Sequence, residues 1–311
     1  MAENSLEALL PQEIARRAET VGYMKASLDA VSTLGLATLA GAFIAMGAVF
    51  SITVATGSSG LPYGVTRLLV GLSFCLGLIL VVVAGAELFT GNNLIVMAWA
   101  SGRISTRMLM RNWILVYIGN LIGSVVTALI TIMAKFPYNA NSAVGQVALN
   151  IAEAKCSLSF LQALALGVLC NALVCIAVWL TLGGHSTTDK ILAIIFPIAA
   201  FVASGFEHSV ANMYFVPLGL LIKADSGFLA GAGLSAASFP NLTLLRFLVG
   251  NLLPVTLGNI IGGSVMVGLA YWSIYLRPKK REPGRRWERR ARTSTPASAV
   301  ATSSALGSGS E

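Results

Sequence analysis

The sequence predicts an all-α membrane protein in which six membrane segments form two inverted repeats of three. Its composition is 56% hydrophobic and 11% charged, with a mean hydropathy of +0.78, whereas an ordinary soluble domain carries about 25% charged residues. Long charge-free tracts alternate with short charged loops. Two of the tracts share a short motif around a glutamate. Together these observations predict the fold class.

This composition excludes a soluble enzyme, a disordered chain and a DNA-binding domain. The formal net charge is +8, but nine of the 21 lysines and arginines lie between Arg277 and Arg292, outside the apolar body. The four cysteines show no C-x-x-C spacing, so we expect neither a disulfide framework nor a metal cluster, and no cofactor.

Residues 1–27 are predicted to form a cytoplasmic amphipathic segment. They lack the basic start and apolar run of a signal peptide. Apolar residues recur at helical spacing opposite charged ones, which predicts a short helix at the membrane face or packed on the body. The apolar residues are Leu6, Leu9, Leu10 and Ile14, and the charged ones are Glu7, Glu13 and Arg17.

Residues 28–276 hold the six membrane segments. A span needs roughly 20 apolar residues, and charge-free stretches predict single spans near 31–55, 112–134, 160–183 and 248–275. The tracts 68–102 and 191–222 are too long for one span, and each carries one carboxylate near its middle, Glu87 or Glu207. We expect these second and fifth segments to be interrupted.

Six crossings place both termini on one side of the membrane. That side would hold 16 lysines and arginines and the other side five, so the positive-inside rule predicts cytoplasmic termini. Without the tail the ratio is seven to five. The tail, residues 277–311, is basic and then rich in Ser, Ala and Thr. We expect it to be disordered and solvated, and the alternative is contact with anionic lipid.

An internal repeat relates the two halves. The motif Gly-x-Glu-x4-Asn and the string Gly-Asn-x-Ile-Gly each occur twice, in the same order. The copies are Gly85, Glu87 and Asn92 with residues 119–123, and Gly205, Glu207 and Asn212 with residues 258–262. Three crossings per repeat turn the second copy upside down, which places a pathway at the interface of the repeats near the bilayer midplane.

The two glutamates are expected to fix the interruptions. A charge at membrane depth costs roughly 2.5–3.5 kcal/mol on insertion scales, so it needs partners. An unwound segment supplies backbone N–H groups and half-helix N-termini for this purpose. Gly85, Gly91 and Gly205 supply the conformational freedom for a break. The Gly-x3-Gly spacing in both Gly-Asn-x-Ile-Gly strings predicts close helix packing.

His208 is the one histidine at midplane depth, which makes it a candidate for the pathway. The Thr90 hydroxyl occupies a comparable place in the other half and is a candidate hydrogen-bond partner. His185 is expected in a solvated loop. An enzyme is not predicted, because the neighbours Glu207, His208 and Ser209 point in different directions and no H-E-x-x-H motif is present.

Several strings resemble the formate/nitrite transporter family, nearest to its formate-channel branch. They are ASGFEHSVANMYF (203–215), GAELFTG (85–91), NALVCIAVWL (171–180), SGRIS (101–105) and NLLPVTLGNIIGG (251–263). The likeness runs from about residue 20 to residue 277. It implies an aquaporin-like protomer in a homopentamer, in a bacterial inner membrane, with one pore in each protomer.

The resemblance also implies site residues. His208 matches the family's central pore histidine, Thr90 its partner, and Asn171 a pore asparagine. Lys155 matches the vestibule lysine that draws anions in, and Glu207 the carboxylate beside the histidine. Phe74, Leu78 and Phe201 resemble the apolar constrictions, although the residues alone indicate only packing at these three positions.

The resemblance therefore implies a channel or transporter for formate and related small monovalent anions, proton-linked through His208. Protonating an acid with a pKa of about 4 costs about 4 kcal/mol at pH 7, which is less than moving a bare anion through an apolar constriction. A charged His208 that stabilises the anion without proton transfer is the alternative mechanism. Nitrite or another monocarboxylate is the alternative substrate. A water or glycerol pore is less favoured, because neither half has an NPA motif.

Overall fold

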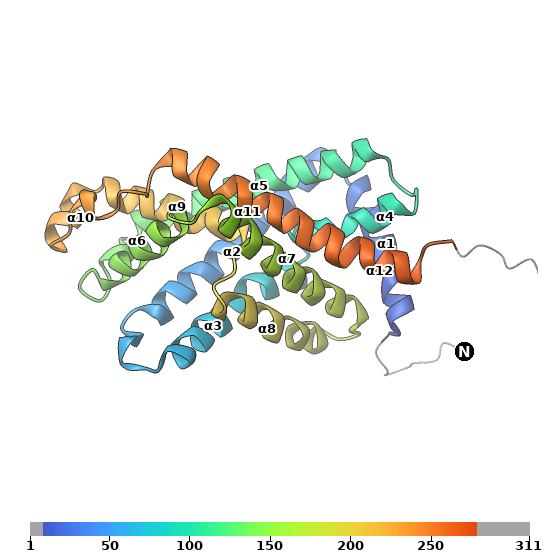
Figure 1. The fold of residues 1–311 in the computed structure, drawn as a ribbon, viewed down its shortest axis with the longest axis horizontal. Coiled ribbons are helices and arrows are strands. Elements are labelled where there is room, and N and C mark those ends of the chain that lie inside the picture. The colour runs from blue at the N-terminus through green and yellow to red at the C-terminus, as the bar shows by residue number, and fades with distance from the viewer. Residues whose placement is uncertain (1–8, 279–311) are drawn as a thin grey trace, which may run out of the picture. The chain divides into compact units, whose positions relative to one another are not determined.

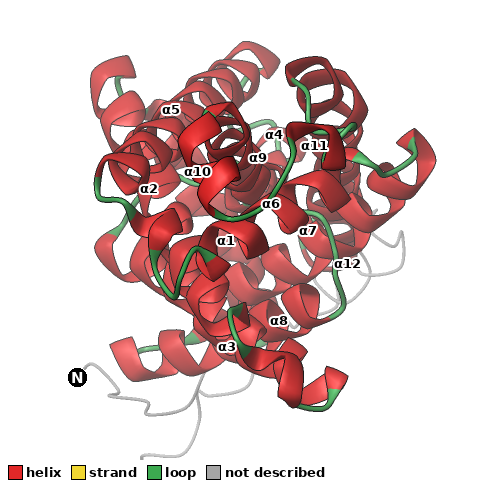
Figure 2. Ribbon diagram, turned by 90° about the vertical axis from the view of Figure 1, so that its left-hand side faces the viewer, coloured by secondary structure: helices red, strands yellow, loops and turns green. Residues whose placement is uncertain are grey.

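The computed structural model of the chain describes residues 9–278. Residues 1–8 and 279–311 lie outside the described residues. The start of the predicted amphipathic segment and nearly all of the predicted tail fall in these two ranges. Between residues 9 and 278 the backbone forms helices joined by turns and loops, with no strand in this range (Figure 2). The predicted all-α fold is confirmed.

The first half of the chain runs from α1 to α5 (Figure 1). A 3-10 turn, η1 (Ser58–Gly60), joins α2 to α3, and another, η3 (Phe136–Tyr138), follows α5. The main elements are α1 (Pro11–Ser27), α2 (Ala30–Ala55), α3 (Tyr63–Ala84), the 3-10 segment η2 (Gly91–Ile95), α4 (Val96–Ala100) and α5 (Thr106–Met133).

The second half repeats this order of elements. Its last crossing is one continuous rod that alternates between α- and π-helical turns. Its elements are α6 (Ala143–Cys156), α7 (Phe160–Gly183), α8 (Thr187–Ala203), α9 (Ser209–Ala224), α10 (Ser226–Gly231), η4 (Ala236–Ser238), η5 (Arg246–Leu252), α11 (Leu253–Ile260), η6 (Ile261–Leu269) and α12 (Ala270–Tyr275).

The predicted spans correspond to observed helices. Among the described residues, five helical stretches are long and apolar enough to cross a membrane, namely α2, α3, α5, α7 and the η5–α12 rod, and α9 is a shorter apolar helix. Helix α6 was not expected. It precedes α7 as α1 precedes α2, so each repeat begins with a short helix before its first span. This order is consistent with the aquaporin-like organisation of two inverted repeats.

Both predicted interruptions are present. Helix α3 ends at Gly85, where φ is +78°, and helix α8 ends before Gly205, where φ is +74°. Only glycine adopts this left-handed conformation without a steric penalty, so these two positions end the helices. Gly91 was also expected to supply such freedom, but its φ is not positive. It begins η2 instead, because the chain has already turned at Gly85.

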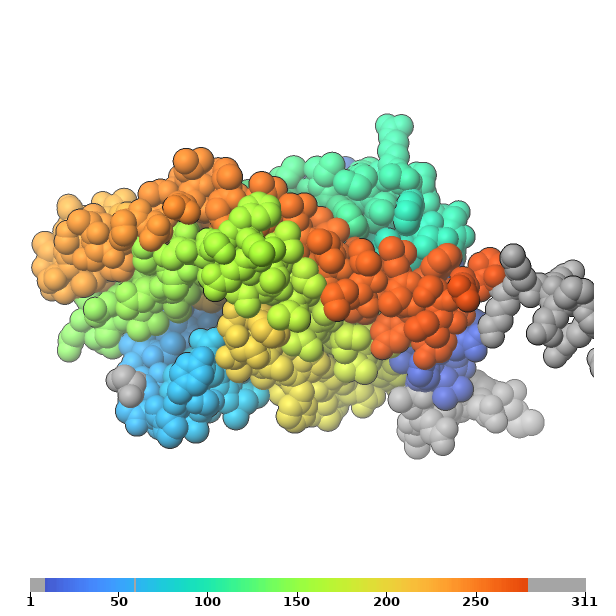
Figure 3. All heavy atoms as spheres, in the orientation of Figure 1, coloured from blue at the N-terminus to red at the C-terminus, as the bar shows by residue number. Residues whose placement is uncertain are grey.

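The Gly-Asn-x-Ile-Gly strings bring helices into close contact, as predicted. A Cβ atom added at Gly123 would collide with the backbone of α2, and one added at Gly258 or Gly262 would collide with the backbone of α7. One added at Gly119 would collide with the Cβ atom of Ala37 on α2. The large core lies where the two halves meet. Helix α1 packs against η2, α4 and α7, and also against α12, whose red turns lie against the dark blue α1 in Figure 3.

Candidate functional site

Two of the cavities in the described part of the chain lie against the broken segments. One has a volume of about 450 Å³, and its wall includes α6, α8 and the Gly205–His208 break. The other has a volume of about 240 Å³, and its wall includes α1 and the Gly85–Gly91 break. A third cavity of only about 10 Å³ shares residues with both. That volume is about the least that holds one water molecule, so the space between the two large cavities is narrow.

Phe74, Leu78, Phe201 and His208 line this narrow cavity together. The rings of Phe74 and Phe201 meet edge to face with centroids 5.8 Å apart, and the rings of Phe201 and His208 stack at 5.8 Å. All four side chains are buried. Phe74, Phe201 and His208 also line the larger cavity, whereas Leu78 lines the smaller one. The three apolar residues that the sequence suggested as constrictions therefore surround the histidine.

The His208 imidazole is held from two sides. The backbone N–H of Ala211 donates to Nδ1 at 3.0 Å, so His208 caps the N-terminus of α9, and Nε2 lies 3.0 Å from the Thr90 hydroxyl oxygen. Since Nδ1 accepts a hydrogen bond, the neutral ring carries its proton on Nε2 and donates it to Thr90. A proton on Nδ1 would face both the Ala211 N–H group and the positive end of the helix dipole. The site therefore favours neutral imidazole.

Asn171 acts on this pair indirectly. Its Nδ2 donates to the backbone carbonyl oxygens of Asn259 at 2.7 Å and Thr90 at 3.2 Å, and to the Asn93 side chain at 3.0 Å. It is fully buried, and its Oδ1 has no hydrogen-bond partner in the described part of the chain. Asn171 thus fixes the position of Thr90 rather than contacting the imidazole.

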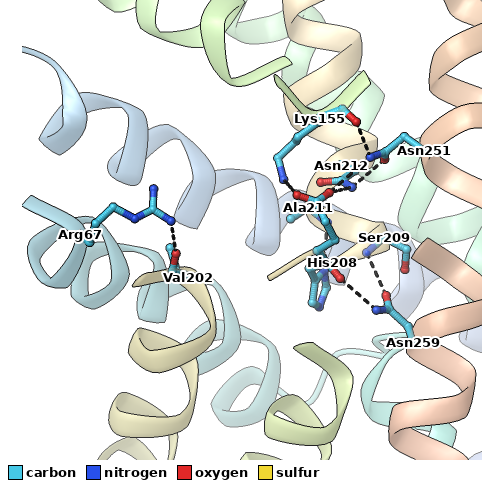
Figure 4. A network of polar contacts seen from close by, with 10 residues as sticks. Arg67, Lys155, Val202, His208, Ser209, Ala211, Asn212, Asn251 and Asn259 are labelled. Carbon is cyan, nitrogen blue, oxygen red and sulfur yellow. Dashed lines mark hydrogen bonds and ion pairs between the residues drawn. The ribbon is translucent and has the colours of Figure 1, made fainter. Parts of the chain in front are cut away.

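Glu207 and Lys155 form a partly buried ion pair on the larger cavity. Lys155 Nζ lies 2.9 Å from Glu207 Oε1, and the other carboxylate oxygen accepts from Asn212 at 2.7 Å and Asn251 at 3.3 Å. Asn251 also donates to the Lys155 carbonyl oxygen at 2.9 Å. Figure 4 shows Lys155, Asn212 and Asn251 gathered above His208. The network joins α6, the broken segment, α9 and η5.

The first half contains the same network on the smaller cavity. Lys25 Nζ lies 2.7 Å from Glu87 Oε1, and Asn92 donates to Glu87 Oε2 at 2.6 Å. Asn92 also donates to Asn112 at 3.0 Å, and Asn112 donates to the Lys25 carbonyl oxygen at 3.2 Å. Each glutamate therefore joins a broken segment to a short helix directly, and to the repeat's last span through the asparagine network. The sequence predicted backbone N–H groups of the unwound segment as the partners of these carboxylates, whereas the partners in the structure are lysine and asparagine side chains.

Sequence reasoning missed five polar residues around the broken segments, among them Asn120, which donates to the Glu87 carbonyl oxygen at 2.9 Å. The omitted residues are Lys25, Asn112, Asn120, Asn251 and Asn259. Two signals were available. Lys25 and Lys155 each lie five residues before the first residue of a span, and the asparagine of each Gly-Asn-x-Ile-Gly string occurs at the same place in both halves. Only glycine spacing was considered there, which predicts packing alone.

Other expected features lie apart from this site. His185 is exposed in the turn between α7 and α8. Within residues 9–278 no group of three or more His, Cys, Asp or Glu side chains is placed to hold a metal ion. All four cysteines are buried, and none forms a disulfide.

The chain matches known proteins over nearly its whole membrane body. The family model described as "Formate/nitrite transporter" matches residues 12–273. The chain is 45% identical to the "Formate channel FocA" of Escherichia coli (strain K12), covering 89% of this chain and 98% of that protein. It is 41% identical to the "Formate channel FocA" of Haemophilus influenzae, covering 84% and 93%.

A solved structure shows the same fold. The "Pentameric formate channel with formate bound" is 48% identical in sequence, has a TM-score of 0.76, and covers 80% of this chain and 98% of its own. The proteins of this family are channels and transporters rather than enzymes. By its sequence, its fold and the extent of both matches, this chain is a member of the formate/nitrite transporter family.

Proposed function

We propose that this protein is a membrane channel that moves formate and related small monovalent anions together with a proton. One observation carries the proposal. Two cavities meet at an apolar neck, and His208 is the one ionisable side chain lining that neck within the described residues. The relatives named formate channels, and the neighbour with formate bound, support formate as the substrate.

Transport as the neutral acid follows from the energetics of the neck. Phe74, Leu78 and Phe201 leave room for about one water molecule, so an anion would lose most of its hydration there. Desolvating a charge costs far more than the roughly 4 kcal/mol needed to protonate a weak acid of pKa about 4 at pH 7. Protonation is therefore the less costly route across the neck.

His208 is the group through which the proton is exchanged. In the neutral state its Nδ1 accepts from Ala211, so the charged imidazolium loses that hydrogen bond and opposes the dipole of α9. The second proton comes from the aqueous side of the larger cavity, whose wall includes His208, and the charged imidazolium then passes one proton to a carboxylate oxygen beside it. The neutral cap is restored once Nδ1 is again without a proton, so the net change is one proton moved from water to the carboxylate. The same geometry argues against the alternative in which His208 stays charged and merely stabilises a passing anion.

The other site residues support this step. Thr90 orients the imidazole, and the Asn171 side chain fixes Thr90 by donating to the Thr90 backbone carbonyl oxygen. Lys155 lines the larger cavity with its ammonium group held by Glu207, so we propose that it meets the anion just before the neck. Glu207 fixes the broken segment. Phe74 and Phe201 close the neck on the side of the larger cavity, and Leu78 closes it on the other.

The assembly and membrane placement extend the proposal. We propose a homopentamer with one pore in each protomer, as in the pentameric neighbour. Residues 28–276 form the channel domain, after a cytoplasmic segment 1–27 and before a cytoplasmic tail 277–311. The excess of lysines and arginines on the side of the termini supports cytoplasmic termini in a bacterial inner membrane.

Flux measured in liposomes tests the function. Purified protein is reconstituted, and formate and nitrite uptake are followed with the internal pH. We expect formate to enter with proton uptake. Nitrite favoured over formate would shift the substrate within the same family, and water flux without anion flux would contradict the proposal.

A further inference from the structure

We propose that Arg67 forms an outer anion-binding station in the larger cavity, taking a small monovalent carboxylate such as formate before it reaches Lys155 and His208. The inference rests on the proposed function and adds to it a residue that collects the substrate. Arg67 lies near the start of α3 and shares the wall of the 450 Å³ cavity with Lys155, Glu207 and His208.

The Arg67 side chain is held in place with donors to spare. Its Nε donates to the carbonyl oxygen of Ala203 at 2.9 Å, and its Nη2 donates to that of Val202 at 2.5 Å. Both carbonyls belong to the C-terminal end of α8. A guanidinium has five N–H donors, so three remain, including both on Nη1. Figure 4 shows Arg67 directed at Val202, apart from the cluster around Lys155. A planar fork already fixed in this way binds a carboxylate with little further loss of conformational freedom.

Arg67 also supplies the cavity's uncompensated charge. Among the described residues of its wall, the cationic side chains are Arg67 and Lys155, and the one carboxylate is Glu207. Glu207 is already paired with Lys155 at 2.9 Å. Within the described part of the chain no carboxylate forms an ion pair with Arg67, and the end of α8 offsets about half a unit charge at most. A carboxylate in the cavity is therefore attracted mainly by Arg67.

The smaller cavity follows the same plan. Its wall contains the paired Lys25 and Glu87, together with Arg17 and Lys190. Neither Arg17 nor Lys190 forms an ion pair with a described carboxylate. Each cavity thus combines a lysine neutralised by the glutamate of its broken segment with cations that have no such partner. The cations without an ion-pair partner come from different positions in the two halves. Their presence in both cavities is therefore not explained by the role of Arg67 as a cap of α8.

A role as a cap of α8 alone is the competing explanation, and two substitutions separate it from anion binding. Arg67→Gln keeps a hydrogen-bond donor for the carbonyls of α8 but removes the charge. Arg67→Lys keeps the charge but loses the planar fork. Lys190→Gln is the matched control, because it removes an unpaired cation from the opposite cavity.

The experiment measures initial formate flux against formate concentration in vesicles with the protein in one orientation, checked by protease removal of an N-terminal tag. Formate is supplied from each side in turn, at low and at high ionic strength. With formate on the side opposite α1, we expect Arg67→Gln to raise the half-saturating concentration about three- to tenfold with an unchanged maximal rate. Most of the ionic-strength dependence from that side should disappear. Arg67→Lys should stay within about twofold, and Lys190→Gln should act from the other side only.

The proposed anion-binding role would be contradicted if Arg67→Gln raised the half-saturating concentration equally from both sides. It would also be contradicted, leaving Arg67 only as a cap of α8, if Arg67→Gln and Arg67→Lys lost maximal rate equally. A wild-type half-saturating concentration in Arg67→Gln would also overturn it. Wild-type flux decides the proposed function separately. If the wild type carries nitrite instead, the same comparison is made with nitrite, and if it carries neither anion, both proposals fail.

Discussion

Asn120 and Asn259 occupy equivalent places in the two halves, and each uses its whole side-chain amide to fix the broken segment of its own repeat. Asn120 donates to the carbonyl oxygens of Ala37 and Glu87 at 2.8 and 2.9 Å, and its Oδ1 accepts from the Phe89 N–H group at 2.9 Å. Asn259 makes the corresponding bonds to Gly167, Glu207 and Ser209 at 2.8, 3.0 and 2.9 Å. In lipid, an unwound backbone is tolerated only when its polar groups find such partners.

Replacing either asparagine by leucine should destabilise the protein by a similar amount. Asn120→Leu leaves the Glu87 carbonyl oxygen and the Phe89 N–H group without this partner, and Asn259→Leu does the same to Glu207 and Ser209. One such buried backbone group costs about 1–3 kcal/mol. The third acceptor, Ala37 or Gly167, lies inside a helix and keeps its helical hydrogen bond. We expect both variants to lower the thermal midpoint of the detergent-solubilised protein and to reduce formate flux. Asn150→Leu, at an exposed position on α6, should leave the midpoint near the wild-type value. A large loss in only one of the pair would contradict their equivalence.

His208→Phe should abolish proton-linked formate uptake, because phenylalanine fills the neck without a group that exchanges protons. His208→Asn separates chemistry from structure. Asparagine is a good N-cap and can still accept from the Ala211 N–H group, so its thermal midpoint should stay close to that of the wild type. Flux with simultaneous internal pH measures the outcome. Wild-type proton uptake in either variant would sink the role given to His208.

Phe201→Ala should widen the neck and weaken its selectivity for small substrates. Phe201 packs against both Phe74 and His208, and removing its ring leaves a cavity that costs about 3–5 kcal/mol when the surroundings do not collapse. We expect acetate and larger monocarboxylates to gain in flux relative to formate. Unchanged relative rates, measured in the same vesicles, would place the constriction elsewhere.

Gly85→Ala and Gly205→Ala should each destabilise the break by about 1–2 kcal/mol, because a side chain in the left-handed conformation clashes with the following carbonyl. Neither position is crowded at short range: a Cβ at Gly85 would meet nothing within 4 Å, and one at Gly205 only Arg67 at 3.5 Å. Gly64→Ala is the matched control, since Gly64 is equally open but lies in the first turn of α3 without a positive φ. The thermal midpoint should fall for the first two and not for the third.

The contact between Tyr138 and Asp225 should give stability that is lost at both ends of the pH range. Tyr138 Oη donates to Asp225 Oδ2 at 2.8 Å. This bond raises the pKa of Tyr138, and the Phe228 N–H group, followed by the Tyr138 hydroxyl, lowers the pKa of Asp225. A lowered acid pKa gives stability above its unfolded value of about 3.9, which is lost as pH falls further. A raised tyrosine pKa gives stability below about 10, which is lost as pH rises through the folded value.

Tyr138→Phe should therefore reduce the loss of stability at high pH. Asp225→Asn should reduce the loss of stability at both low and high pH. The thermal midpoint against pH measures this. Asp29→Asn provides the comparison, because Asp29 caps α2 through Val31 and Ser32 and has a lowered pKa caused first by the Ser32 N–H bond, with no tyrosine involved. Asp29→Asn should change the thermal midpoint only at low pH. If Tyr138→Phe loses stability at high pH just as the wild type does, the contact does not stabilise the fold.

Much of the architecture could be predicted from the sequence. Charge-free length located the spans, since a bilayer excludes unpaired charges. The repeated glutamate motif located both breaks, because a carboxylate at that depth needs hydrogen-bond donors that a regular helix does not supply. These signals are local, so one chain without relatives or coordinates is enough to find them.

Only the tertiary structure decided which side chains face the pathway. The spans are apolar on all sides, because one face meets lipid and the other meets protein, so periodicity does not distinguish Phe74, Leu78 and Phe201 from packing residues. The pairing of His208 with Thr90, 118 residues apart in the chain, depends on two breaks arriving at the same depth from opposite directions. The compensation of Lys155 by Glu207, which leaves Arg67 without an ion-pair partner in the described wall of the larger cavity, also appears only once distances are known. Charge counted along a sequence does not show which charges are already neutralised in space.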